Sequence, residues 1–248
     1  MIIYPAIELM QGRCVSLRRG NLHEADFWDV DPVDIAKSFV EAGAEGIHVT
    51  DLDAVAGHEM NNLSLVAEIT RKAGAPIQVS GGFRTQERIE YAFETGAARV
   101  VMGTIATRHP DWVKAMAKYY PDQIVLAVDV WNGQVMVDGW REACVIRPET
   151  LIAEFADVPL AAIKITDIDN DVDATEASLG VISKLAEASN APVIASGLVH
   201  SINDIARLKY VPKIAGALVG RALVRGTVDL AEALEVAGEA KGRVAEFI

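Results

Sequence analysis

The sequence has only two cysteines among its 248 residues, Cys14 and Cys144, and they form no C-x-x-C or Cys/His cluster. A zinc site or a disulfide-based scaffold is therefore not expected, and no metal or organic cofactor is predicted. The five histidines show no metal-ligand spacing, and His48, inside an apolar segment, is interpreted as structural. No apolar run approaches the roughly 20 residues of a membrane-spanning helix. The N-terminal MIIYPAIELM lacks the basic segment of a secretory signal, so we expect a cytoplasmic protein.

Basic residues are scarce relative to acidic ones. The chain has 23 Lys and Arg against 35 Asp and Glu, a formal net charge of −12. This excess opposes nonspecific binding to nucleic acid or to anionic membranes, so neither is an expected partner. A small anionic ligand stays compatible with the charge, because backbone N–H groups and one or two cations can build a local site.

Short β-branched segments alternate with longer amphipathic segments along the whole chain. The predicted strands are 2–9, 46–53, 76–80, 98–103, 123–130, 161–168, 192–196 and 216–220, and the predicted helices are 32–43, 62–73, 85–95, 109–119, 148–156, 177–189, 202–208 and 229–238. Strands that are apolar throughout are typical of a parallel sheet covered on both faces. Eight strand–helix units predict a (β/α)8 TIM barrel, with a doubly wound open sheet as the alternative.

The chain contains an internal repeat. IHVTDLD at 47–53 resembles IKITDID at 163–169, and Ser80-Gly81 corresponds to Ser196-Gly197 at the same spacing. The repeat predicts two duplicated (βα)4 halves of the barrel.

These halves cover about 1–122 and 123–248. A (βα)4 half has open sheet edges and cannot enclose a core by itself. We therefore expect one barrel over 1–248, present as a monomer, and not two domains.

Two acidic residues end predicted strands on opposite sides of such a barrel. Active sites of TIM barrels lie at the carboxyl ends of the strands. Glu8 ends the first strand and Asp129 ends the fifth. Two carboxyls that face each other across a mouth can act as acid and base if their surroundings separate their pKa values. The alternative is a structural role, in which these acids cap helices or pair with Arg.

Glycine-containing turns follow two pairs of neighbouring strands. The residues in the turns after strands three and four are Gly81, Gly82, Arg84, Gly103 and Thr104, and those after strands seven and eight are Gly197, Gly220 and Arg221. Glycine permits close approach of the backbone, and a helix N-terminus favours an anion. One such turn would be ordinary loop geometry, but two matched pairs favour phosphate sites. Their opposite placement predicts a ligand with a phosphate at each end.

The order of these motifs resembles one known family. PAIEL, VTDLD, SGGFR, VVMGT, AVDV, TDI, IASG and VGRAL follow each other as in the isomerases that act on phosphoribosylformimino-5-aminoimidazole carboxamide ribotide (ProFAR) in histidine biosynthesis. The resemblance extends over nearly the whole chain. It implies an intramolecular oxidoreductase that converts an aminoaldose to an aminoketose, an Amadori rearrangement, on a bisphosphorylated substrate and without a cofactor.

The resemblance also implies roles for individual residues. In the family, the carboxylate that ends strand one acts as the general base. The Asp that ends strand five acts as the general acid that opens the ribose ring. These positions are Glu8 and Asp129 here, and Thr166 is kept at the end of strand six. The loop 131–142 contains Trp140, which either stacks on the imidazole of the substrate or anchors the loop; its Asn132-Gly133 pair predicts a hairpin.

Four residues depart from the family pattern. Glu8 stands where the family has Asp, Ser16 where it has Arg, and Val172 and Leu198 where it has Gly. The departures leave an alternative open. A divergent paralogue would act on, or only bind, another phosphorylated sugar or aminosugar.

Overall fold

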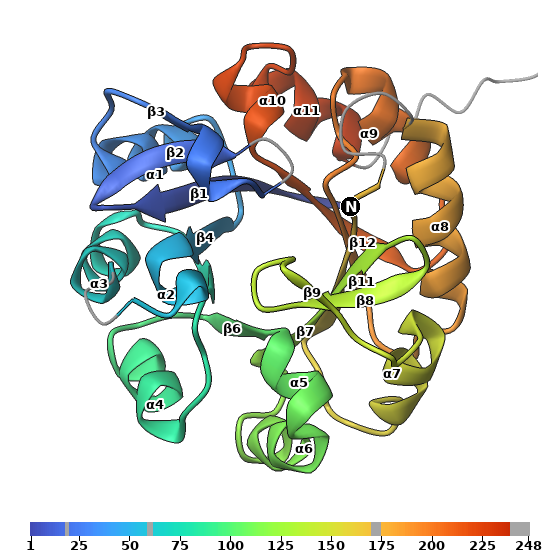
Figure 1. Cartoon of the computed structure of the whole chain (residues 1–248). Helices are drawn as coiled ribbons and strands as arrows, with labels where there is room; N and C mark the ends of the chain where they lie inside the picture. The colour runs from blue at the N-terminus through green and yellow to red at the C-terminus, as the bar shows by residue number, and fades with distance from the viewer. Residues whose placement is uncertain (18–19, 59–61, 170–174, 239–248) are drawn as a thin grey trace, which may run out of the picture.

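The computed structural model describes residues 1–17, 20–58, 62–169 and 175–238, and a closed ring of parallel strands lies at its centre (Figure 1). In ring order the strands are β1 (Ile2–Met10), β4 (Ile47–Asp51), β5 (Ile77–Ser80), β6 (Arg99–Met102), β7 (Ile124–Trp131), β10 (Ala162–Asp167), β11 (Val193–Ser196) and β12 (Ile214–Val219). β12 pairs in parallel with β1 and closes the ring. The predicted TIM barrel is confirmed, and an open doubly wound sheet is excluded.

Helices surround the ring on its outside (Figure 1). The predicted ones are α1 (Pro32–Glu41), α3 (Leu63–Lys72), α4 (Gln86–Glu94), α6 (Pro110–Tyr119), α7 (Pro148–Glu154), α8 (Thr175–Glu187), α9 (Ile202–Leu208) and α11 (Leu230–Ala237). Some of these helices begin at a capping side chain: the Asp31 carboxylate accepts hydrogen bonds from the Val33 and Asp34 N–H groups at the start of α1. Within the described residues, no helix is long and apolar enough to cross a membrane.

Shorter elements extend from the ring. They are β2 (Arg13–Leu17), η1 (Leu22–Glu24), β3 (Ala25–Phe27), α2 (Leu52–Ala56), α5 (Thr104–Arg108), β8 (Gln134–Val137), β9 (Glu142–Ala143) and α10 (Arg221–Val224). The hairpin predicted at Asn132-Gly133 is confirmed, because β7 and β8 pair antiparallel around these two residues, whose φ angles of 48° and 71° fit a type I′ turn. The other short elements were not predicted, since so few residues carry no readable periodicity.

Side chains along each strand alternate between the helix layer and the inside of the ring. On β10, Ile163 and Ile165 belong to the main core between strands and helices, whereas Ala162 belongs to a separate cluster. That cluster joins side chains of six strands, which can meet only inside the ring: Tyr4, Val101, Val125, Ala127, Ala162, Ile194 and Leu218. By the same alternation, Lys164 and Thr166 face the inside of the barrel.

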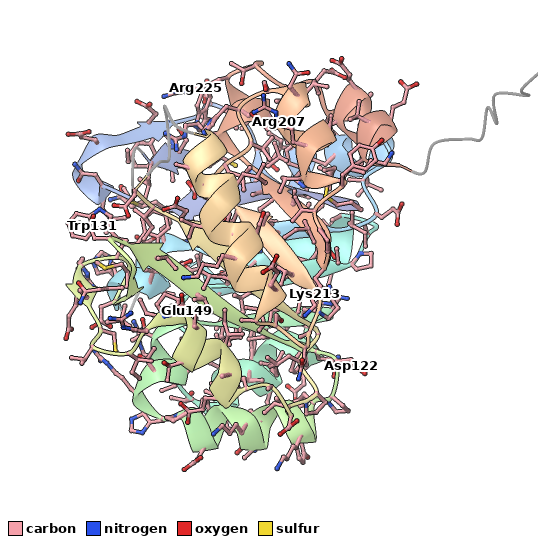
Figure 2. The ribbon with its side chains drawn as sticks, turned by 90° about the vertical axis from the view of Figure 1, so that its right-hand side faces the viewer. Asp122, Trp131, Glu149, Arg207, Lys213 and Arg225 are labelled. Atoms are coloured by element: carbon pink, nitrogen blue, oxygen red, sulfur yellow. The ribbon has the colours of Figure 1, made fainter. Side chains whose placement is uncertain are left out.

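The two ends of the barrel are distinguished in Figure 2. Trp131, at the carboxyl end of β7, lies on the left side of that view, and Asp122 and Lys213, which precede β7 and β12, lie on the right. The end on the left, called the mouth below, is where the strands have their carboxyl ends. In TIM barrels this end carries the functional groups.

Candidate active site

A pocket opens at the mouth, and every residue predicted for the site lines it. These residues are Glu8, Gly81, Gly82, Arg84, Gly103, Thr104, Asp129, Trp140, Thr166, Gly197, Gly220 and Arg221. They come from the ends of seven of the ring strands, from the loops that follow them and from the loop after β8. The closure of the ring brings together residues that are far apart along the chain.

Asp129 lies at the centre of a hydrogen-bonded group in this pocket. Its Oδ1 accepts from the Lys164 ammonium at 3.0 Å, and its Oδ2 accepts from the indole N–H of Trp140 at 2.8 Å. The same ammonium donates to Thr166 Oγ1, also at 3.0 Å. Asp129 and Thr166 are register partners on the adjacent strands β7 and β10. Both carboxylate oxygens of Asp129 therefore have a charged or polar donor.

These contacts determine the protonation of Asp129. Burial alone would raise its pKa, but the positive charge of Lys164 and the hydrogen bonds from Trp140 and Lys164 outweigh burial and hold the pKa below its usual value. Asp129 is therefore a carboxylate at neutral pH. In this arrangement it has no proton of its own to donate.

Glu8 occupies the opposite side of the mouth. It lies on β1, which is diametrically opposed to β7 in the ring, and its register partner on β4 is Thr50. The arrangement mirrors Asp129 and Thr166 on β7 and β10. The predicted opposition of two strand-end carboxyls is thus present in the fold.

His48 lies deeper in the pocket and is buried. Its Nε2 is 3.0 Å from Thr50 Oγ1, and its Nδ1 is 3.0 Å from Gln78 Nε2. Burial, followed by the charge of Lys164, lowers the pKa of His48 from 6.5 to about 3 against the opposing effect of Asp129. His48 is therefore neutral and has a hydrogen-bond partner at each ring nitrogen. Among the described residues, no group of three or more His, Cys, Asp or Glu could hold a metal ion.

The glycines after β5 are also required by packing. A Cβ on Gly81, at φ +110°, would lie 2.3 Å from the Asp51 carbonyl oxygen, and one on Gly82 would lie 2.7 Å from Ala54 Cβ. Arg84 donates to the carbonyls of Ala54 and Val55, at 3.0 and 3.3 Å. This turn and Arg84 therefore hold α2 against the mouth, in addition to lining the pocket.

The glycines after β6 and β12 have matching geometry. Gly103 has φ −111° and ψ −93°, and Gly220 has φ −112° and ψ −88°. A Cβ on Gly103 would meet Ala127 Cβ at 3.4 Å, and one on Gly220 would meet Ala6 Cβ at the same distance. The two turns face each other across the ring, as the internal repeat predicts.

Two of the departures noted in the sequence, Leu198 and Ser16, occupy different places. The side chain of Leu198 is 1% exposed and packs in the main core, so it does not line the pocket. Ser16 is buried on β2 and does line the pocket. Val172 lies outside the described residues.

The chain was compared with known proteins. A family model described as "Histidine biosynthesis protein" matches residues 2–229. The chain belongs to this family.

Isomerases from several bacteria resemble the chain over nearly its whole length. Isomerase 2 of Ruegeria pomeroyi, named as acting on 1-(5-phosphoribosyl)-5-((5-phosphoribosylamino)methylideneamino)imidazole-4-carboxamide, is 56% identical over 247 residues, with 100% of both chains covered. Isomerase 1 of a Ruegeria species carries the same substrate name and is 53% identical over 248 residues, again with 100% of both chains covered. A Caulobacter isomerase of that name is 42% identical over 239 residues, which cover 96% of this chain and 99% of its own.

Lys164 is among the pocket residues that sequence reasoning missed in this family member. A signal was present: Lys164 occupies the position of His48 in the repeat, within an otherwise apolar strand. Side chains two residues apart on a strand point to the same face, so a lysine two residues before Thr166 is a candidate for the pocket. The partner of its ammonium, Asp129, belongs to another strand, so only the pairing of β7 with β10 reveals the contact.

Proposed function

We propose that this chain catalyses the isomerisation named for its relatives, the Amadori rearrangement of ProFAR to the corresponding aminoketose in histidine biosynthesis. The observation that carries the proposal is the opposition of Glu8 and Asp129 across a pocket with matched glycine turns on two sides. Full-length similarity to isomerases favours this activity over one on another phosphorylated sugar.

The reaction needs two groups on opposite sides of the ribose. A proton must reach the ring oxygen so that the ring opens to a protonated imine, and a base must then remove the proton on C2. The Asp129 side of the mouth supplies the first proton, and Glu8 acts as the base. General acid–base catalysis of this kind contributes about 10²- to 10⁴-fold each.

The two ends of the substrate are assigned to the glycine turns. One phosphate binds between the turns after β5 and β6, beside Gly82 and Gly103, and the other binds between those after β11 and β12, beside Gly197 and Gly220. Support comes from the matched backbone geometry of Gly103 and Gly220 and from the pocket lining. Because β5 and β6 lie opposite β11 and β12 in the ring, a ligand with phosphates at both ends would span the mouth.

A direct test uses the purified full chain with ProFAR. We expect turnover to the aminoketose, and we expect the gene to restore growth without histidine to a strain that lacks its isomerase. Glu8→Gln is the matched inactive control in both assays. A well-expressed wild-type protein that fails in both would overturn the proposal.

We further propose that the enzyme acts in the cytoplasm as a monomer. Support for a monomer comes from the site, because all residues assigned to it belong to one chain. Light scattering after size exclusion would give a mass near 26.7 kDa for a monomer. Twice that mass would contradict the proposal.

A further inference from the structure

Lys164 carries a positive charge that is enclosed in the barrel. The residue is 8% exposed, lies on β10 with its side chain toward the inside of the ring, and lines the pocket. Lysine is rarely buried unless it is paired. Its ion pair with Asp129, at 3.0 Å, satisfies that requirement, but a buried ion pair by itself is weak evidence for a stabilising role.

The hydrogen bonds of Lys164 leave it one donor. An ammonium group has three N–H donors. Within the described part of the chain, it donates to Asp129 Oδ1 and to Thr166 Oγ1. Both acceptors are residues assigned to the active site. The remaining N–H belongs to a side chain that lines the pocket.

Asp129 is badly placed to be the proton donor that ring opening needs. Its two oxygens accept from Lys164 and Trp140, and a proton on either oxygen would weaken that oxygen as an acceptor. The charge of Lys164 also opposes protonation. On the same side of the mouth, the Lys164 ammonium lines the pocket and has N–H groups to donate.

We propose that Lys164 is the catalytic residue that protonates the ring oxygen, and that Asp129 is a positioning residue that holds its ammonium. This inference rests on the proposed function and names the donor for its first step. Thr166 provides the second contact that orients Nζ.

The proton balance closes with two groups. Lys164 gives a proton to the ring oxygen, the C1–O bond breaks with its electron pair going to oxygen, and the nitrogen lone pair forms the protonated C1=N imine. Glu8 takes the proton on C2, the C–H electron pair forms the C1=C2 bond, and the imine electron pair returns to nitrogen. Glu8 then returns its proton to C1. The C2 hydroxyl loses its proton to the Lys164 amine as the ketone forms, so both groups regain their starting states.

The decisive variant is Lys164→Arg. It keeps the charge beside Asp129, but a guanidinium does not release a proton in proteins. We expect kcat with ProFAR to fall at least 100-fold in both Lys164→Arg and Lys164→Met, with KM changed less than about fivefold. Lys184→Met, which removes the exposed ion pair with Glu149, is the matched control and should keep wild-type turnover.

Rescue by an added amine separates proton donation from structure. In Lys164→Ala, ethylammonium should restore part of the lost kcat in proportion to its concentration. It should have no such effect in Asp129→Ala, where Lys164 is present but misplaced. Urea unfolding midpoints would show whether these variants fold. If Lys164→Ala and Lys164→Met do not fold, the test rests on Lys164→Arg.

The outcomes separate this inference from the proposed function. Inactive wild-type protein overturns both. An active wild type with near-normal kcat in Lys164→Arg, or with no amine rescue in Lys164→Ala, overturns the role of Lys164 alone and returns the acid role to Asp129.

Discussion

His48 and Lys164 occupy the same position in the two halves of the repeat, and each contacts the Thr two residues further along its strand at 3.0 Å. His48 Nε2 meets Thr50 Oγ1 on β4, and Lys164 Nζ meets Thr166 Oγ1 on β10. β4 and β10 lie opposite each other in the ring. One half of the barrel thus places a neutral imidazole, and the other an ammonium, at equivalent points of one pocket.

His48→Gln should change how stability depends on pH. The pKa of His48 is lowered from 6.5 to about 3. Between these values the unfolded chain binds a proton that the folded chain does not, so stability falls as pH falls below 6.5. The contribution of His48 to the free energy of unfolding should drop by about 2 kcal/mol between pH 7 and pH 5.

Urea unfolding of the variant at these two pH values checks this. The difference between them should be about 2 kcal/mol smaller in His48→Gln than in wild type. His109→Gln, at an exposed position, should keep the wild-type difference. Equal differences in wild type and His48→Gln would contradict the burial of a neutral imidazole.

Glu8→Gln should lower kcat by about 10²- to 10⁴-fold, because the amide cannot accept the C2 proton. Glu8→Asp keeps the carboxylate but withdraws it by about one ångström, a displacement that costs up to about 10²-fold. Steady-state kinetics with ProFAR would give both values. Glu149→Gln, in an ion pair at the surface, controls for the loss of a carboxylate as such. Undiminished turnover in Glu8→Gln would remove Glu8 from the base role.

Gly81→Ala should be strongly destabilising. A left-handed φ costs a non-glycine residue about 1–2 kcal/mol. The new methyl group would also lie 2.3 Å from the Asp51 carbonyl oxygen, and such overlap costs about 1–3 kcal/mol more. Gly57→Ala is the matched control, since Gly57 has φ +83° and nothing within 4 Å of its Cβ position. If the free energy of unfolding falls equally in the two variants, α2 and the preceding Asp51 move away from the new methyl group at little cost.

Trp140→Phe should weaken catalysis while it keeps the aromatic ring. It removes the 2.8 Å hydrogen bond to Asp129 Oδ2, and hydrogen bonds to charged groups contribute about 1.5–3 kcal/mol. If that energy holds Asp129 and Lys164 in place, kcat/KM should fall about 10- to 100-fold. Trp28→Phe is the control, because the buried indole N–H of Trp28 has no hydrogen-bond partner in the described residues. Equal kcat/KM in Trp140→Phe and wild type would assign Trp140 no part in orienting Asp129.

Much of the fold could be predicted because its signals are local. Each ring strand is a short run of mostly apolar residues, and the major helices have an amphipathic period, in some cases with a capping residue such as Asp31. The type I′ turn at Asn132-Gly133 depends on two adjacent residues that tolerate positive φ. Elements such as α2 and α5 escaped prediction, because they are single turns held by contacts with the mouth.

The predicted site residues line one pocket, but their chemical states were not predicted. Strand ends in a parallel barrel share one mouth, so the ends of the predicted strands already assembled Glu8, Asp129 and Thr166 in one place. The interpretation of His48 as a satisfied structural residue agrees with its two hydrogen bonds, although it also lines the pocket. Arg84, by contrast, uses its guanidinium on the carbonyls of α2, which no local pattern indicated.

The sequence by itself determined the order of eight strand–helix units, the repeat and the strand-end residues Glu8, Asp129 and Thr166 at the mouth, because each follows from periodicity and position along a strand. Only the tertiary structure decided that Asp129 is held as a carboxylate and that Lys164 is its partner. The physical reason is the short range of these interactions. A pKa responds to charges and donors within a few ångströms, and here they come from β10 and from the loop after β8, which the closed ring brings beside β7.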